Sequence, residues 1–262
     1  MILKIFVFIL GAICGSFLNV CIYRLPKNES VIKPASYCPH CKKPILLFDN
    51  IPILSYLILR GRCRYCKEKI SIQYFLVELI TAFMFLLFYL HLEGFNPLFL
   101  IYNLLGCGLI VSTFIDIKHK IIPDEITVYG LFIGFIISII YPLLHKTNSW
   151  FSSGSNSLLG ILTGGGSIYL AGLLGNIIFK KESMGGGDVK FLAMIGAFLG
   201  WKLTLLVFFI APIFGALVGI IVKLKTKKDI IPYAPFLSLT TFIVIFFGDR
   251  MMEFIMKYII RY

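Results

Sequence analysis

The chain has 262 residues, of which 58% are hydrophobic and 15% are charged, and its formal net charge is +12. This composition, with a mean hydropathy of +0.91, excludes an ordinary soluble domain and indicates a polytopic membrane protein. In such a chain the location of Lys and Arg matters more than their sum. We therefore expect the basic residues to meet anionic lipid headgroups, and we predict no nucleic-acid partner.

Apolar stretches recur along the whole chain and predict an all-α polytopic membrane protein with about eight transmembrane helices. The predicted spans are residues 2–22, 72–92, 97–115, 126–145, 157–179, 189–201, 203–223 and 231–248. Because this number is even, both termini should lie on the same side of the membrane.

Lys and Arg are concentrated in alternate connections between these spans. Nineteen of the 25 lie in four connections, at residues 24–71, 116–125, 180–190 and 223–230. Connections rich in Lys and Arg face the cytoplasm. We therefore predict a multi-pass protein of the cytoplasmic membrane with both termini outside.

One substantial polar region, at residues 24–71, interrupts the apolar pattern, and the predicted domain boundaries lie at its two ends. A first transmembrane helix at residues 1–23 is followed by a small cytoplasmic loop subdomain at 24–71, and residues 72–262 form the membrane core. A second polar stretch, at 145–157, is rich in Ser, Asn and Gly and is predicted to be an external loop.

Two cysteine motifs inside the cytoplasmic loop form a local repeat, CPHCKKPI at residues 38–45 and CRYCKEKI at residues 63–70. The two-residue gap lets both thiolates of a motif point at one ion, so the repeat predicts a structural, tetrahedral zinc site. The predicted ligands are Cys38, Cys41, Cys63 and Cys66. Two disulfides are the alternative, which a reducing cytosol disfavours.

Three acids lie within a predicted span or at its edge, where an ionisable group indicates a functional site: Glu78, Asp116 and Asp188. The predicted topology puts Asp116 and Asp188 at the cytoplasmic face, which suggests an aspartyl dyad. In such a pair one carboxylate activates water while the other, protonated, polarises the scissile carbonyl. The structural alternatives are a helix N-cap for Asp188 and an acid at the membrane edge near Lys118 or Lys120 for Asp116.

A third acid, Asp124, competes for a place in the dyad. It follows a proline and precedes an apolar run, so we assign it a structural role as the N-cap of the next span. Within the dyad, Asp188 begins a helix beside Lys190, whereas Asp116 ends one. Helix dipoles then predict that Asp188 has more of the base character.

Three glycines, Gly185, Gly186 and Gly187, directly precede Asp188. Glycines leave the backbone beside the acid without side chains, so a substrate strand or Asp116 could approach closely. We predict that they form a substrate-approach loop.

Four motifs together resemble the type IV prepilin peptidase, or leader peptidase, family. They are GSFLNVCIYRLP at 15–26, NIPILSYLILRGRCRYC at 50–66, FIDIKHKIIPDEIT at 114–127 and GGGDVKFLAMIGAFLGW at 185–201. The resemblance implies an aspartyl membrane protease that removes basic leaders from prepilins or pseudopilins at the cytoplasmic face of the inner membrane. Its catalytic pair matches Asp116 and Asp188.

The same resemblance implies that the new N-terminus is methylated with S-adenosylmethionine. No dinucleotide-type Gly-x-Gly-x-x-Gly stretch supports this activity, and Gly61 with the cysteine loop is the candidate region. Family members commonly have glycine after each cysteine motif, where this chain has Lys42 and Lys67.

Two readings from other classes remain open at this point. One is a cation-coupled transporter that binds its ion at Asp116 and Asp188, and the other is a zinc-stapled membrane scaffold without chemistry. The residues predict neither an oligomeric state nor which pilin-like substrate is cleaved.

Overall fold

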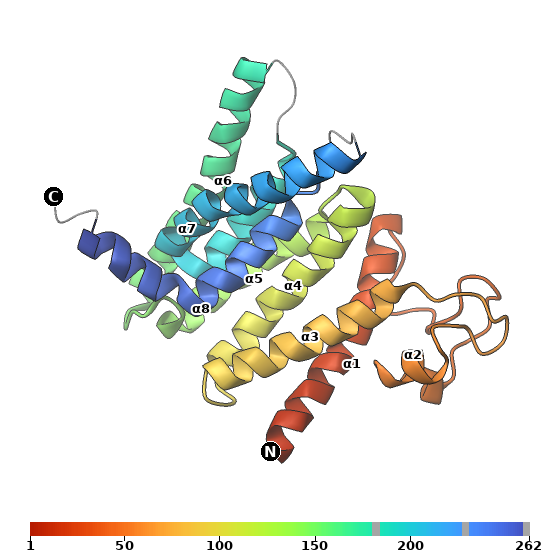
Figure 1. Ribbon diagram of the computed structural model, residues 1–262. Coiled ribbons are helices and arrows are strands. Elements are labelled where there is room, and N and C mark those ends of the chain that lie inside the picture. Colours follow the sequence, from red (N-terminus) through yellow and green to blue (C-terminus); the bar gives the residue numbers. More distant parts are fainter. Residues whose placement is uncertain (180–183, 227–230, 259–262) are drawn as a thin grey trace. The chain divides into compact units, whose positions relative to one another are not determined.

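The computed structural model describes residues 1–179, 184–226 and 231–258, and in these ranges the regular structure is helical without a β-strand (Figure 1). The chain divides into two compact units, Met1–Val111 and Ser112–Tyr262. The all-α prediction is confirmed. The division into 1–23, 24–71 and 72–262 stays a prediction.

The first unit pairs two long helices with the cysteine loop. Its elements are α1 (Ile2–Arg24), η1 (Leu25–Lys27), η2 (Leu47–Asn50), α2 (Leu54–Ile58), α3 (Ile72–His91) and most of α4 (Pro97–His119). Helices α1 and α3 lie side by side (Figure 1). Glycines permit this approach: a Cβ on Gly11 would lie 2.8 Å from the Cα of Ala82, and one on Gly15 would lie 2.7 Å from the Cα of Glu78.

The second unit contains the end of α4 and the remaining helices. These are α5 (Asp124–Ile140), η3 (Pro142–His145), α6 (Trp150–Phe179), α7 (Gly186–Thr226) and α8 (Ala234–Tyr258). Helices α6 and α7 meet at two glycines, because a Cβ on Gly160 would lie only 2.1 Å from the carbonyl oxygen of Gly196. The Ser157 hydroxyl donates to the Ala197 carbonyl at 2.8 Å in the same contact.

The predicted external loop at 145–157 is wrong over most of its length, because α6 begins at Trp150. The small polar residues that suggested a loop serve helix packing instead. Ser153 and Ser157 are fully buried. Small side chains bring helices close together, which a composition rule for loops does not take into account.

The predicted spans 189–201 and 203–223 form one continuous element, α7, with a break at Gly200. Gly200 has φ 74° and ψ 169°, a conformation that glycine adopts at little cost. A Cβ there would also lie 2.9 Å from Nδ1 of His145. Two helical segments therefore join directly, without the polar connection that a sequence reading requires.

Among the described residues, five helices are long and apolar enough to cross a membrane. They are Ile2–Lys27, Ile72–His91, Pro97–His119, Trp150–Ile178 and Gly186–Ile221. Helix α5 has 17 residues, fewer than the roughly 20 that a bilayer requires. The polytopic membrane class is confirmed, and the count of about eight spans stays a prediction.

Candidate metal centre and aspartate site

The first cysteine motif is a closed turn. An isolated β-bridge joins Tyr37 to Pro44 on either side of it. Inside the turn, Cys38 N–H donates to the Lys43 carbonyl at 3.0 Å and Lys42 N–H donates to the Cys38 carbonyl at 2.9 Å. These local hydrogen bonds shape the backbone around the sulfur atoms.

The second cysteine motif repeats this geometry. Its bridge joins Arg62 to Lys69. Cys63 N–H donates to the Glu68 carbonyl at 2.9 Å, and Lys67 N–H donates to the Cys63 carbonyl at 3.0 Å. The sequence repeat is therefore one local structure formed twice.

Both motifs require a left-handed residue directly after the second cysteine. Lys42 has φ 58° and Lys67 has φ 60°. This region favours glycine, so a lysine there introduces steric strain of about 1 kcal/mol or more. The turns therefore form with lysine at the position where family members commonly have glycine.

The four cysteines of the two motifs converge, and the cluster could hold a metal ion. Their sulfur atoms all lie within 4.8 Å of one another, and Sγ of Cys38 lies 3.9 Å from Sγ of Cys66. Tetrahedral zinc with Zn–S bonds of about 2.3 Å separates its sulfurs by about 3.8 Å. All seven cysteines are free thiols, so the structure has clustered ligands instead of two disulfides.

A hydrogen bond from the Cys66 backbone lowers the pKa of the Cys63 thiol to about 7. The thiolate, which is the metal-binding form, is therefore accessible near neutral pH. This backbone hydrogen bond within one motif is a further local feature that suits a metal centre.

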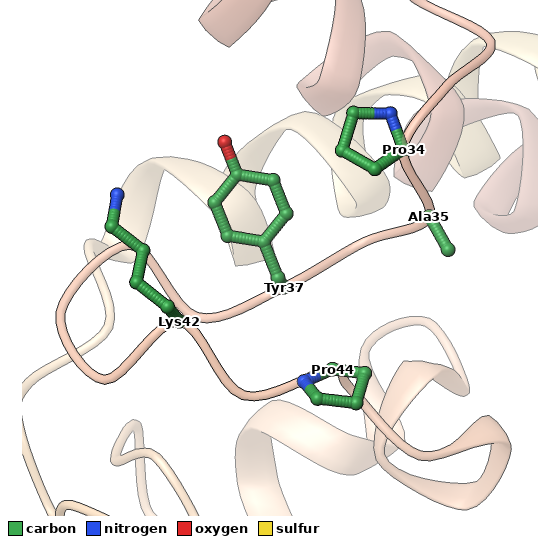
Figure 2. A pocket seen from close by; sticks show the side chains of 5 residues that line it. All are labelled: Pro34, Ala35, Tyr37, Lys42 and Pro44. Carbon is green, nitrogen blue, oxygen red and sulfur yellow. The ribbon is translucent and has the colours of Figure 1, made fainter.

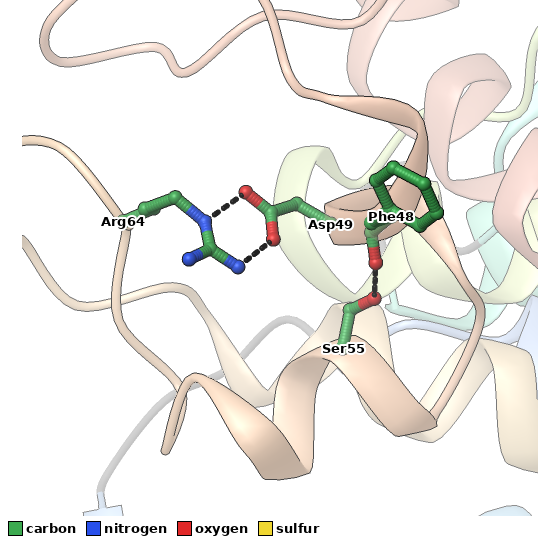
Figure 3. Close-up of polar contacts among 4 residues, drawn as sticks. All are labelled: Phe48, Asp49, Ser55 and Arg64. Atoms are coloured by element: carbon green, nitrogen blue, oxygen red, sulfur yellow. Dashed lines mark hydrogen bonds and ion pairs between the residues drawn. The ribbon is translucent and has the colours of Figure 1, made fainter.

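An ion pair connects the second motif to the segment that follows the first. The Arg64 guanidinium forms a two-pronged contact with Asp49, with hydrogen bonds of 2.7 and 2.6 Å (Figure 3). Arg64 thereby holds the pKa of the Asp49 carboxyl below its usual value. The Ser55 hydroxyl donates to the Phe48 carbonyl at 2.9 Å and fixes the start of α2 against the same segment.

A pocket lies beside the first motif, lined by Pro34, Ala35, Tyr37, Lys42 and Pro44 (Figure 2). The Lys42 ammonium lies 5.4 Å from the centre of the Tyr37 ring. The lining combines an aromatic ring and two prolines with a single charge, and it contains no nucleophile or acid. We assign it no chemistry.

Gly61, the candidate for methyl transfer, closes α2. Its φ is 66°, and its N–H donates to the Tyr56 carbonyl at 2.9 Å. A Cβ at Gly61 would lie 2.9 Å from the Tyr56 hydroxyl. This left-handed helix end explains the glycine without a cofactor.

Glu78, the third acid singled out by its position, anchors the cysteine loop to the helices of the first unit. The carboxylate accepts a 2.6 Å hydrogen bond from Ile53 N–H and a second from the Ser16 hydroxyl on α1. Ile53 has φ 65°, which is unusual for a β-branched residue. The structure therefore gives Glu78 a positioning role.

Asp116 is buried in the last turns of α4 and binds the start of α8. Its Oδ2 accepts from Ala234 N–H at 2.9 Å, and the carboxyl accepts a further backbone hydrogen bond from Tyr233. One turn away, the Thr113 hydroxyl donates to Ser238 at 2.8 Å. The positive end of the α8 helix dipole also stabilises a carboxylate at this position.

Asp188 lies in the first turn of α7 and is partly buried. Its charge interacts with that of Asp116, so the second unit brings together two acids 72 residues apart in the chain. The Asp188 carboxyl accepts a backbone hydrogen bond from Gly185. It also lies within electrostatic reach of the Tyr233 phenol.

The three glycines before Asp188 have different surroundings, and none has a positive φ. A Cβ on Gly185 would lie 3.5 Å from the Asp188 carboxyl, one on Gly187 would lie 3.3 Å from Ile122, and one on Gly186 would meet nothing within 4 Å. Open space beside the acid is therefore greatest at Gly186.

Asp124 is the first residue of α5 and Pro123 is its N-cap, so the prediction that Asp124 is the N-cap is wrong by one residue. Both of its carboxylate oxygens accept from the Lys190 ammonium at 2.8 Å. Lys190 is thus committed to Asp124, and the expectation that it supports the Asp188 carboxylate is wrong. The structural assignment of Asp124 gains an ion pair that links α5 to α7.

The segment before α8 belongs to this site, and the sequence did not predict it. Tyr233 and Ala234 supply the backbone donors to Asp116. The only sequence signal is IPYAP at residues 231–235, in which two prolines bracket the helix start. Nothing in that signal indicates that the segment lies against residue 116.

Two family descriptions match this chain. The bacterial peptidase A24 N-terminal domain matches residues 9–92, and the type IV leader peptidase family matches residues 103–220. The second match contains both Asp116 and Asp188.

Several curated relatives bear the name prepilin leader peptidase/N-methyltransferase. The relative from Myxococcus xanthus is 39% identical, over 86% of this chain and 64% of its own length. Those from Aeromonas hydrophila and Pseudomonas aeruginosa are 33% and 32% identical, over 93% and 92% of this chain and 90% and 89% of their own lengths. No solved structure matches the chain.

Proposed function

Because the chain belongs to the type IV leader peptidase family, we propose that it cleaves the basic leader peptides of prepilins or pseudopilins at the cytoplasmic membrane. Asp116 and Asp188 are the proposed catalytic dyad. The observation that supports this most directly is that both carboxyl groups lie in one unit, at opposite ends of their helices, with interacting charges.

The proposed reaction needs one ionised and one protonated carboxyl group. The carboxylate takes a proton from water as the water oxygen attacks the scissile carbonyl carbon, and the protonated acid donates to the carbonyl oxygen. The tetrahedral intermediate then breaks its C–N bond as the acid that took the proton from water donates it to the leaving amine, and the other acid recovers its proton from the hydroxyl of the intermediate. Two acids at one site supply both functions, which neither could supply alone.

The hydrogen bonds favour Asp116 as the base, opposite to the assignment from helix dipoles in the sequence. Asp116 accepts two backbone N–H groups at the start of α8, and such donors stabilise a carboxylate. Asp188 accepts one, from Gly185, and lacks the expected Lys190 contact. We therefore assign the proton at rest to Asp188.

The proposed metal is zinc, held by Cys38, Cys41, Cys63 and Cys66. Four thiolates complete a tetrahedral shell and leave no position for water, so the ion is structural. It would stabilise a loop that has only short helices of its own.

The relatives' names support a second proposed activity, methylation of the new N-terminus with S-adenosylmethionine as the methyl donor. Gly61 remains the candidate position in the cysteine loop. The turn that Gly61 closes has its own structural reason, and the residues around it form no glycine-rich cradle for a nucleotide. Support for methylation therefore comes from the family alone.

The proposed orientation places the cysteine loop, Asp116 and Asp188 at the cytoplasmic face and both termini outside. The distribution of Lys and Arg supports it, since 19 of the 25 lie in the connections assigned to that face. The proposed partners are prepilin or pseudopilin substrates and the lipid bilayer.

Cleavage of a prepilin by the reconstituted protein tests the proposed function. Asp116→Ala and Asp188→Ala should each reduce cleavage to background, because each removes half of the dyad. Asp124→Ala is the matched control, since it removes a nearby acid that is already paired with Lys190. Cleavage that survives either dyad substitution would show that the dyad is not the catalytic centre.

The transporter and scaffold readings are not favoured. Two thirds or more of several relatives named as peptidases align with this chain, and the leader peptidase match contains both acids. A transporter would translocate ions in a reconstituted vesicle without cleaving prepilin, and a scaffold would do neither.

A further inference from the structure

Tyr233 interacts with both of the proposed catalytic acids. Its backbone N–H donates to Asp116, and its phenol lies within electrostatic reach of Asp188. The ring also packs near Gly215 of α7, where a Cβ would lie 3.8 Å from the ring edge. The backbone of Tyr233 thus binds one member of the dyad, and its phenol interacts electrostatically with the other.

The Tyr233 hydroxyl oxygen is buried and has no hydrogen-bond partner within the part of the chain that the structure describes. A buried hydroxyl without a partner loses its hydrogen bonds to water and gains none in return. The mechanism proposed above does not use this group. An unpaired donor beside a reaction centre is a reason to seek its partner among the reacting atoms.

We propose that Tyr233 is a third catalytic residue of the aspartate site, whose hydroxyl donates a hydrogen bond to the scissile carbonyl oxygen. The phenol keeps its proton throughout and forms no covalent bond. Its contribution grows as negative charge develops on that oxygen in the tetrahedral intermediate. This inference rests on the proposed peptidase function.

The arrangement suits a donor that acts together with Asp188. Asp188 carries the proton at rest in the proposed mechanism. Its protonated carboxyl is therefore a second hydrogen-bond donor to the carbonyl oxygen. The Asp188 and Tyr233 side chains interact through charge and not through a hydrogen bond with each other. An oxygen between them could accept from both, as in sites where two donors stabilise an oxyanion.

Steady-state cleavage of a prepilin by full-length Tyr233→Phe, reconstituted in lipid, tests the inference. The variant should lower kcat about 100-fold, as loss of one oxyanion donor does, while KM stays within about twofold. Tyr169→Phe makes the same chemical change on the exposed face of α6 and should leave both constants unchanged. Replacing Tyr233 with 4-aminophenylalanine restores a donor and should recover part of the lost kcat.

The outcomes separate the two hypotheses. If the wild type cleaves and Tyr233→Phe retains kcat within about twofold, or raises KM alone, Tyr233 is not catalytic although the peptidase function stands. If the wild type cleaves no prepilin, the proposed function itself fails. If both Tyr233→Phe and 4-fluorophenylalanine at this position fail to fold, the hydroxyl is structural and the inference is overturned.

Discussion

The cysteine cluster of the first unit and the aspartate site of the second are formed in opposite ways. Each cysteine motif is closed by hydrogen bonds that span at most nine residues along the chain. Asp116, in contrast, accepts its hydrogen bond from Ala234, 118 residues away. A centre formed from local turns can be recognised in a sequence, whereas one formed where helix ends meet depends on how the helices pack.

The two centres also depend on different forces. The cysteine loop has short helices and local hydrogen bonds, so a metal ion would supply most of its stability. The aspartate site lies among long helices whose packing supports it regardless of a metal. Perturbing one centre should therefore leave the other largely intact.

Removal of the proposed metal should have the largest effect, and only on the cysteine loop. Structural zinc contributes on the order of 10 kcal/mol to the folding of small sites. Cys38→Ser or a strong chelator should increase hydrogen exchange across residues 36–70, while exchange at Ala234 stays unchanged. Cys107→Ser is a matched control outside the cluster. Equal loss of protection in both units would contradict the independence of the two centres.

Loss of the Glu78 carboxylate should be the next largest effect. Glu78→Ala leaves the Ile53 N–H without its acceptor and should reduce the free energy of unfolding of the first unit by about 3 kcal/mol. Glu78→Gln keeps an acceptor and should reduce it less. Denaturation in detergent micelles measures both. A Glu78→Ala protein as stable as wild type would remove the proposed anchor between the loop and α3.

Loss of the Asp116 carboxylate should uncap α8. Asp116→Ala removes the acceptor of Ala234 N–H and should reduce stability by about 2 kcal/mol, with faster hydrogen exchange at the start of α8. Asp188→Ala should abolish cleavage without changing that exchange, because the backbone hydrogen bond that Asp188 accepts comes from Gly185 and not from the start of α8. If the two variants give the same exchange pattern, Asp116 has no structural role beyond that of Asp188.

Glycine at the two strained lysines should stabilise the cysteine loop. Lys42→Gly and Lys67→Gly each relieve a left-handed residue and should add about 1 kcal/mol, less the entropy that glycine gains on unfolding. Slower metal release to a chelator measures the gain. Lys43→Gly, at a neighbouring position without positive φ, should not slow release. Faster release from both glycine variants would show that the lysine side chains contribute more than the strain removes.

The Asp49–Arg64 pair should give the smallest effect, because the Arg64 side chain is 49% exposed to solvent, although that of Asp49 is only 7% exposed. The pKa of the Asp49 carboxyl in the folded state lies below its unfolded value of about 3.9. The pair therefore stabilises the folded state fully above that pH, and this stabilisation is lost as the pH falls through the folded-state pKa. Carboxyl titration by NMR should show the low pKa, and Arg64→Gln should return it to about 3.9. An unchanged pKa in that variant would identify another cause.

The cysteine cluster illustrates how far local sequence rules extend. Repetition of Cys-x-x-Cys identified four candidate ligands, and the structure brings all four cysteines together. The external loop at 145–157 shows the limit of such rules, because small residues are equally suited to close helix contacts. The same holds for Lys190, whose nearness to Asp188 in sequence gave no indication that Asp124 is its partner.

Composition, hydropathy and local motifs were sufficient for the membrane class and the all-α fold, and they singled out four candidate metal ligands and two acids of interest, since each depends on residue type and short spacing. Tertiary structure alone decided the rest. It put the start of α8 against Asp116, buried the Tyr233 hydroxyl without a partner among the described residues, and gave Glu78 a partner in the cysteine loop. These contacts join segments 25 to 118 residues apart. Which distant backbone donor meets which acid depends on the packing of whole helices, and no local pattern encodes it.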